Sequence, residues 1–218
     1  MITSSDEEYK STKRIKQGKA RLAEPFGELA AWISDRWHVN VLNVIYDRRN
    51  NLHPPRLQVI LEHKSEAQVF HEGGNFDRKK QEEIASKFTQ INSLHTQRGY
   101  DVDGLFVVFS AFAPLAREEA DSKISKSDID ALKKRIGNPE LWEISRFFGY
   151  VTFLFFTDAQ AKEYAANGKQ TEFAQMYFEI LKPHDEFDYL NQGDFTVALD
   201  SKQNFDENYE SNWYYYYK

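Results

Sequence analysis

The chain has 218 residues, of which 41% are hydrophobic, and its formal net charge is −6. This hydrophobic content supplies a folded core, and the acidic balance opposes binding of the whole chain to nucleic acid or to anionic membranes. Cysteine is absent, which excludes disulfides, thiol catalysis and thiolate metal sites and favours a reducing compartment, so we expect a cytoplasmic protein.

Charge is unevenly distributed along the chain. Positions 10–21 hold six basic residues and no acid, whereas positions 172–218 hold ten acids and three lysines. After Tyr9, Ile15 is nearly the only apolar side chain of the basic stretch, so this stretch could form a helix but has almost no face to bury. We therefore expect residues 1–21 to be a basic, peripheral N-terminal segment.

The first half of the chain alternates between helical and strand patterns. Apolar residues at steps of three or four predict the first helix, and Asn- and Pro-rich positions between two apolar runs predict an antiparallel hairpin. The predicted elements are a helix at about 24–37, strands at 39–46, 56–62 and 67–70, and a helix that begins at Asp77.

In the second half, the runs 105–112 and 147–156 are apolar at nearly every position, as in strands that are buried on both faces. We expect these two runs to form the centre of one sheet. The other predicted elements are a helix from Ser127 to Gly137, a helix from Asp158 that bends near Gly168 and stops at Pro183, and strands at 195–199 and 213–217.

These elements predict an α+β fold, with a mixed, largely antiparallel sheet of about six strands and helices packed on it. No Pro-, Gly- or Ser-rich linker separates parts of the chain, so we expect residues 22–218 to form a single domain. The longest apolar run covers ten positions, whereas a helix that spans a bilayer needs about 20 residues, so we expect no membrane association.

Glu62-His63-Lys64 ends the second predicted strand. A Glu-x-Lys pair on a strand projects both side chains to one face, as metal-dependent nucleases require. The order of elements over about residues 24–112 resembles the restriction-endonuclease-like nuclease family, whose motif adds an Asp on a preceding strand. That resemblance implies that Glu62 holds a divalent metal ion and that Lys64 orients the attacking water.

The predicted hairpin separates Glu62 from Asp47, the acid on the preceding strand. Antiparallel pairing places the two about six residues apart along the strands, which is roughly 20 Å, so one metal ion cannot bridge them. Another acid would have to complete the site, and the candidates are Glu24, Glu28 and Asp103.

The sequence contains no other catalytic pattern. The six histidines lack the His-Glu-x-x-His spacing, and serine elbows, phosphate-binding loops and dinucleotide-binding glycines are missing. We therefore expect no cofactor, no metal site and no nucleic-acid partner.

The C-terminal fifteen residues are the most distinctive segment, because seven of them are aromatic. Four consecutive tyrosines on a strand must face both ways, so some of them should stay exposed unless they pack along neighbours of an edge strand. Aromatic side chains beside carboxylates are typical of an interface with a basic protein. The candidate partner-binding residues are Asp206, Glu207, Tyr209, Glu210, Trp213, Tyr215 and Tyr217.

From these observations we derive one preferred hypothesis. It is a non-catalytic protein-binding module, for example an inhibitor of the immunity or antitoxin type, whose acidic and aromatic C-terminal surface covers a basic partner such as a toxin nuclease. The alternatives are a divalent-metal-dependent nuclease that uses Glu62 and Lys64, and a structural or oligomeric protein. The sequence does not fix the oligomeric state.

Overall fold

The computed structural model describes residues 3–48, 54–95 and 99–218. The tip of the predicted hairpin turn, with His53, lies outside these residues. Helices and strands both contribute to the fold, which confirms the predicted α+β class.

The chain divides into two compact units, Met1–Leu115 and Ala116–Lys218. The boundary falls inside helix α5 (Phe112–Ser122). Because a helix connects the two units, the sequence between them need not be rich in Pro, Gly or Ser. Each unit has its own sheet and core. Whether residues 22–218 unfold as a single cooperative domain stays a prediction.

The first unit has a three-stranded sheet in the order β1-β2-β5 and a small two-stranded sheet, β3-β4. β1 and β2 are antiparallel, which confirms the predicted hairpin, and β2 pairs with β5 in parallel. The helices of this unit are α1 (Glu7–Lys16), α2 (Phe26–Trp37), α3 (Lys64–Gln68) and α4 (Arg78–Leu94), and its strands are β1 (Val41–Asp47), β2 (Arg56–Leu61), β3 (His71–Glu72), β4 (Asn75–Phe76) and β5 (Phe106–Ala111).

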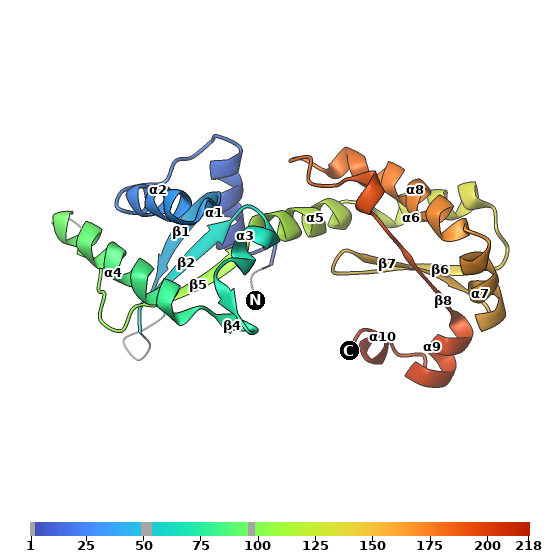
Figure 1. The fold of residues 1–218 in the computed structure, drawn as a ribbon. Helices are drawn as coiled ribbons and strands as arrows, with labels where there is room; N and C mark the ends of the chain where they lie inside the picture. The colour runs from blue at the N-terminus through green and yellow to red at the C-terminus, as the bar shows by residue number, and fades with distance from the viewer. Residues whose placement is uncertain (1–2, 49–53, 96–98) are drawn as a thin grey trace. The chain divides into compact units, whose positions relative to one another are not determined.

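Helices α2 and α4 pack together beside the sheet of the first unit (Figure 1). Their apolar stripes supply Leu29, Ile33, Ile84 and Phe88, which are fully buried among the side chains of β1, β2 and β5. Helix α4 begins at the residue expected for it, because the Asp77 side chain accepts hydrogen bonds from two backbone N–H groups of the first turn.

The N-terminal segment is more than a charged helix. Tyr9 of α1 is 1% exposed and its ring stacks on Phe112 at 5.1 Å, and Thr12 is fully buried. The Thr12 hydroxyl accepts a hydrogen bond from the Asn43 side chain of β1 at 3.0 Å. The expectation that this helix buries almost nothing is therefore wrong, because one aromatic ring and one hydroxyl anchor it.

The second unit has a three-stranded sheet in the order β6-β7-β8, with β6 antiparallel and β8 parallel to β7. Its helices are α6 (Lys126–Ile136), α7 (Asp158–Ala166), α8 (Lys169–Leu181), α9 (Lys202–Tyr209) and α10 (Trp213–Tyr216), with 3₁₀ turns at Lys182–His184 and Gln192–Asp194, and its strands are β6 (Leu141–Phe147), β7 (Tyr150–Phe155) and β8 (Ala198–Ser201).

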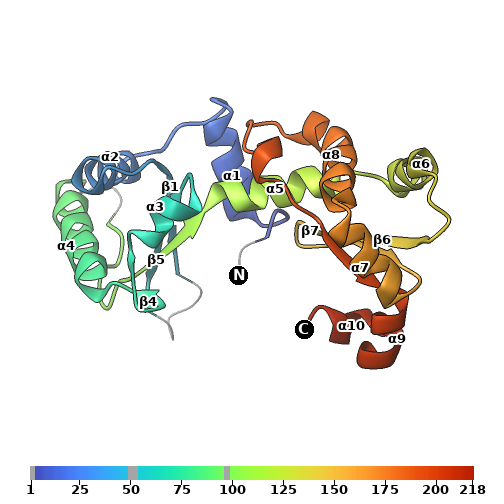
Figure 2. The same ribbon diagram turned by 45° about the vertical axis from the view of Figure 1, so that its right-hand side comes forward.

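The second sheet is covered on both faces. Ile144, Val151, Phe153 and Phe155 belong to a buried cluster that includes side chains of α6, α7 and α8. Helices α9 and α10 lie on the side of the sheet opposite to α6 and α8 in both views (Figures 1 and 2). The C-terminal helices therefore form a layer of their own on this sheet.

Several expected strands differ from the structure. The runs 105–112 and 147–156 were expected at the centre of one six-stranded sheet, but β5 lies at an edge of the first sheet and β7 at the centre of the second. Positive φ angles at Phe148 and Gly149 turn the second run back on itself, which makes it the end of β6 and all of β7. The expected strand at 67–70 is the end of helix α3 and the turn that follows it, and the expected strand at 213–217 is helix α10 with the residue after it.

In the part of the chain that the structure describes, every helix is too short or too polar to cross a lipid bilayer.

Candidate functional site

The Glu-x-Lys pair does not have the geometry that a nuclease site needs. β2 ends at Leu61, and Lys64 is the first residue of α3, where its side chain is exposed. Glu62 is 9% exposed and binds the Lys16 ammonium at 2.6 Å, and its other oxygen accepts a hydrogen bond from the Asn40 side chain. The Glu62 carboxylate thus joins α1 to the start of β1.

The acids that could have completed such a site lie elsewhere in the first unit. Asp47 pairs with Arg56 at 2.7 Å at the opposite end of the β1–β2 ladder, as the predicted register requires. Asp103 precedes β5, and the first residue of β5, Phe106, pairs with the same Arg56 in the sheet. Both lie about five to six residues along the sheet from Glu62, or roughly 20 Å.

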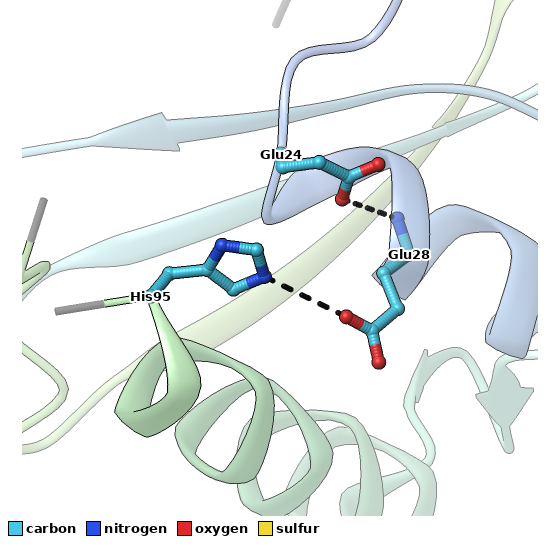
Figure 3. Close-up of side chains that lie close together, drawn as sticks. All are labelled: Glu24, Glu28 and His95. Carbon is cyan, nitrogen blue, oxygen red and sulfur yellow. Dashed lines mark hydrogen bonds and ion pairs between the residues drawn. The ribbon is translucent and has the colours of Figure 1, made fainter. Parts of the chain in front are cut away.

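Glu24 and Glu28 lie at the start of α2, whereas Asn40, which contacts Glu62, follows the end of that helix. Twelve helical residues span about 18 Å, so these carboxylates are also remote from Glu62. The Glu28 carboxylate points instead toward His95, and the Glu24 carboxylate lies near both (Figure 3). The described residues therefore do not assemble the metal site that the nuclease alternative requires.

The C-terminal segment folds back onto its own sheet. The Ser201 side chain caps α9 by accepting a hydrogen bond from the Asn204 N–H, and the Asn212 side chain caps α10 in the same way through the Tyr214 N–H. Phe205 is buried and its ring lies 4.2 Å from that of Trp213, which in turn stacks on Trp142 of β6. These ring contacts attach the C-terminal segment to the second sheet.

Two tyrosine hydroxyls fix the position of α10 on the sheet. Tyr216 donates a hydrogen bond to Asp200 of β8 at 2.6 Å, and Tyr217 donates one to Ser145 of β6 at 2.6 Å. Burial, followed by the Asp200 carboxylate, raises the pKa of Tyr216, and burial also raises the pKa of Tyr217. Both groups therefore stay protonated and act as donors.

The acidic members of the predicted surface lie on α9 and at its end. Asp206 is bound by the Lys202 ammonium, which lowers the pKa of its carboxyl, and it also accepts a hydrogen bond from Ser211 at 2.7 Å. Glu207 and Glu210 are exposed, and Tyr209 is half-buried with its ring edge against Tyr216. Two of the three predicted acids thus face solvent.

The aromatic members divide into docked and exposed side chains. Tyr217 stacks on Phe147 of β6 at 4.4 Å and is half-buried, and Trp213 is 37% exposed. Tyr215 is 46% exposed, and the neighbouring Tyr214 is 68% exposed.

Sequence reasoning missed that the β6–β7 turn joins this surface. Phe147, Phe148 and Tyr150 have 40%, 58% and 75% of their surface exposed. Phe147 contacts both Phe148 and Tyr217, and Tyr150 is opposite Phe147 in the ladder. We call this surface the aromatic face, and it consists of Phe147, Phe148, Tyr150, Trp213, Tyr214, Tyr215 and Tyr217. Its sequence signal was Phe148-Gly149, a pair that can form a tight hairpin turn.

The aromatic face is hollowed. A cavity of about 490 Å³ lies between the end of β6 and α10, and its lining is mostly apolar. Arg146 and Lys218 supply positive charge at this cavity, while the surrounding second unit has nineteen acidic and twelve basic residues. The first unit is close to neutral, with fifteen acidic and sixteen basic residues.

Comparison of the chain with protein-family models, with curated proteins and with solved structures gives no match in any of the three.

Proposed function

We propose that the protein is a non-catalytic binding module and that the aromatic face of its second unit contacts a basic partner protein. The observation that carries this proposal is the exposure of Phe148, Tyr150, Tyr214 and Tyr215 in two segments that meet where Phe147 stacks on Tyr217. Monomeric proteins rarely expose contiguous apolar surface without a binding role, and Tyr, Trp and Phe are enriched in the cores of protein interfaces.

The backbone at Phe148 supports the same conclusion. Phe148 has φ of 47° and Gly149 has φ of 78°, so both central residues of the β6–β7 turn adopt the left-handed conformation of a type I′ turn. Asn or Gly fills such a position at little cost, whereas a bulky side chain there is a conformational outlier. Because the phenylalanine is 58% exposed and occupies a conformation that disfavours bulky residues, its presence supports a role in binding.

Charge supports a basic partner. The seven-charge acidic excess of the second unit would attract a basic protein over long range and accelerate encounter at low ionic strength. Arginine and lysine side chains of such a partner can also stack on exposed tyrosine rings. An inhibitor of the immunity or antitoxin type that acts on a basic toxin in the cytoplasm is the form of this proposal that we favour.

The experiment is affinity capture from native lysate at low and high salt, followed by titration of the captured basic protein in purified form. The informative variant combines Phe148→Asn with Tyr215→Ser. Asn suits the turn, so the variant should fold at least as well as the wild type, yet it loses two exposed rings. We expect its affinity to fall at least about tenfold, since interface hot spots contribute about 2 kcal/mol or more each.

Phe156→Ser is the matched control, because Phe156 is a 45% exposed aromatic residue of the same unit outside the aromatic face. It should leave the affinity unchanged. Equal binding by wild type and the Phe148/Tyr215 variant, or binding that salt does not weaken, would refute the proposed surface. A wild-type chain that forms a dimer which the same variant dissociates would instead support the oligomeric alternative.

A further inference from the structure

The first unit brings together three side chains with metal-binding atoms, none of which belongs to the aromatic face. Within the described part of the chain, Glu24, Glu28 and His95 form a group in which one oxygen of each carboxylate and one imidazole nitrogen lie within 4.8 Å of one another. The His95 Nε2 atom lies 3.6 Å from a Glu28 oxygen. In Figure 3 the imidazole and both carboxylates point into the same space.

Two packed helices hold these side chains in place. Glu28 lies in the first turn of α2, and His95 follows the last residue of α4. Between the same two helices, Phe26 of α2 stacks on Phe88 of α4 at 5.9 Å, and the Tyr100 ring packs against Phe26. The core of the unit therefore fixes the distance between the helix ends, so the convergence of His95 with the two glutamates does not depend on surface side chains alone.

The Glu24 carboxylate has a defined position. One of its oxygens accepts a hydrogen bond from the Glu28 N–H at 3.1 Å, and the carboxylate lies over Gly27. A Cβ atom at position 27 would come within 3.0 Å of a Glu24 oxygen. The absence of a side chain at Gly27 thus leaves room for the carboxylate in this position, near His95.

We propose that Glu24, Glu28 and His95 bind a divalent transition-metal ion, with Zn²⁺ as the best match. Two carboxylates neutralise the ion, and an imidazole ligand favours Zn²⁺ over Mg²⁺ or Ca²⁺, which prefer oxygen. Ligand atoms about 2.1 Å from a tetrahedral ion lie about 3.4 Å from one another. The His95–Glu28 pair already has nearly this separation, and rotation of two exposed glutamate side chains supplies the rest.

Three protein ligands leave a fourth position open for water or for a donor from another molecule. The ion would tie the start of α2 to the end of α4. It would therefore stabilise the first unit, because a ligand that binds the folded state alone raises stability by mass action. This inference is independent of the proposed function, which concerns the second unit.

The test is calorimetric titration of the tag-free, full-length chain with ZnCl₂, with thermal denaturation measured with and without the ion. We expect one Zn²⁺ per chain and a higher midpoint temperature. His95→Ala and Glu28→Gln should each weaken binding at least about tenfold, since loss of an outer-shell partner alone costs about 10- to 100-fold.

His184→Ala and Glu72→Gln are the controls, since both residues lie outside the cluster, and they should bind Zn²⁺ as the wild type does. Circular dichroism would verify that all variants are folded. Equal affinity in the wild type and His95→Ala, or the absence of Zn²⁺ binding to the wild type at millimolar ion, would overturn the proposal.

Discussion

Tyr177→Phe should destabilise the second unit without creating a cavity. Tyr177 of α8 is fully buried, and its hydroxyl donates a hydrogen bond to the carboxylate of Asp121, which is 9% exposed. Burial, together with this carboxylate, raises the pKa of Tyr177, so the phenol remains a donor at every pH of interest. The nearest Arg146 nitrogen lies 3.8 Å from the other carboxylate oxygen, which is too long for a hydrogen bond.

The variant keeps the ring and removes the close donor of a buried, charged acceptor. Hydrogen bonds to charged groups contribute about 1.5–3 kcal/mol, so we expect the free energy of unfolding to fall by about 2 kcal/mol. With a urea dependence of about 1.3 kcal/mol/M for a unit of this size, the midpoint should fall by about 1.5 M.

Urea titration monitored by tryptophan fluorescence measures this change. Trp142 and Trp213 report on the second unit, and Trp32 and Trp37 on the first. If the units unfold separately, Tyr177→Phe will shift one of two transitions, whereas one shared transition would support a single cooperative domain. Tyr214→Phe, at a 68% exposed position, should change stability by less than about 0.5 kcal/mol. A loss that small in Tyr177→Phe would refute the reasoning.

Two further predictions concern how the second unit holds its C-terminal part. Ser201→Ala removes the N-cap of α9 and a hydrogen bond to Asp158, so it should cost about 1–2 kcal/mol in thermal denaturation, whereas Gln203→Ala should not. Burial raises the pKa of Asp185, but hydrogen bonds from Lys182, Leu190 and Tyr189 outweigh it and lower the pKa overall. The stabilisation from Asp185 is therefore present at neutral pH and is lost as the pH falls below about 4, so the difference in urea midpoint between wild type and Asp185→Asn should be constant above about pH 5 and should shrink as the pH falls below about 4. Midpoints that stay equally far apart at pH 3 would contradict this.

The helices α2, α4 and α6 were the most predictable part of the fold, because their sequences carry local signals. The periodic stripe of α2, the Asp77 cap of α4 and the Gly137 end of α6 all lie where the sequence predicts them. The predicted β1–β2 hairpin and its register are also observed. Each of these features depends on residues close together in the sequence.

The assignment of strands to sheets could not be predicted in the same way. An apolar run shows that a strand is buried, but it does not show which sheet buries it. β5 and β7 have similar apolar sequences and belong to different units. β5 continues directly into α5. The sequence therefore has no segment with the composition of a linker that would have indicated the boundary.

The Zn²⁺ ligands illustrate the same limit for a site. Glu24 and Glu28 are four residues apart, which is a common spacing, and His95 is too distant in the sequence for any motif to include it. Only the packing of α2 against α4 brings the three together. The Glu-x-Lys pair is the opposite case, since Glu62 and Lys64 are close in the sequence but do not lie on one strand: β2 ends before Glu62, and Lys64 begins α3.

The C-terminal aromatics show that the exposure of some tyrosines could be predicted although their secondary structure was predicted wrongly. Tyrosine favours strands, so residues 213–217 were expected as an edge strand. Asn212 supplies a helix cap immediately before them, and the segment forms a single helical turn. In a strand, side chains alternate between two faces, whereas in this turn Tyr216 and Tyr217 reach the sheet and Tyr214 and Tyr215 remain exposed. The helical turn thus separates anchoring from exposed rings, and it is this separation that leaves Tyr215 available for replacement without loss of the fold.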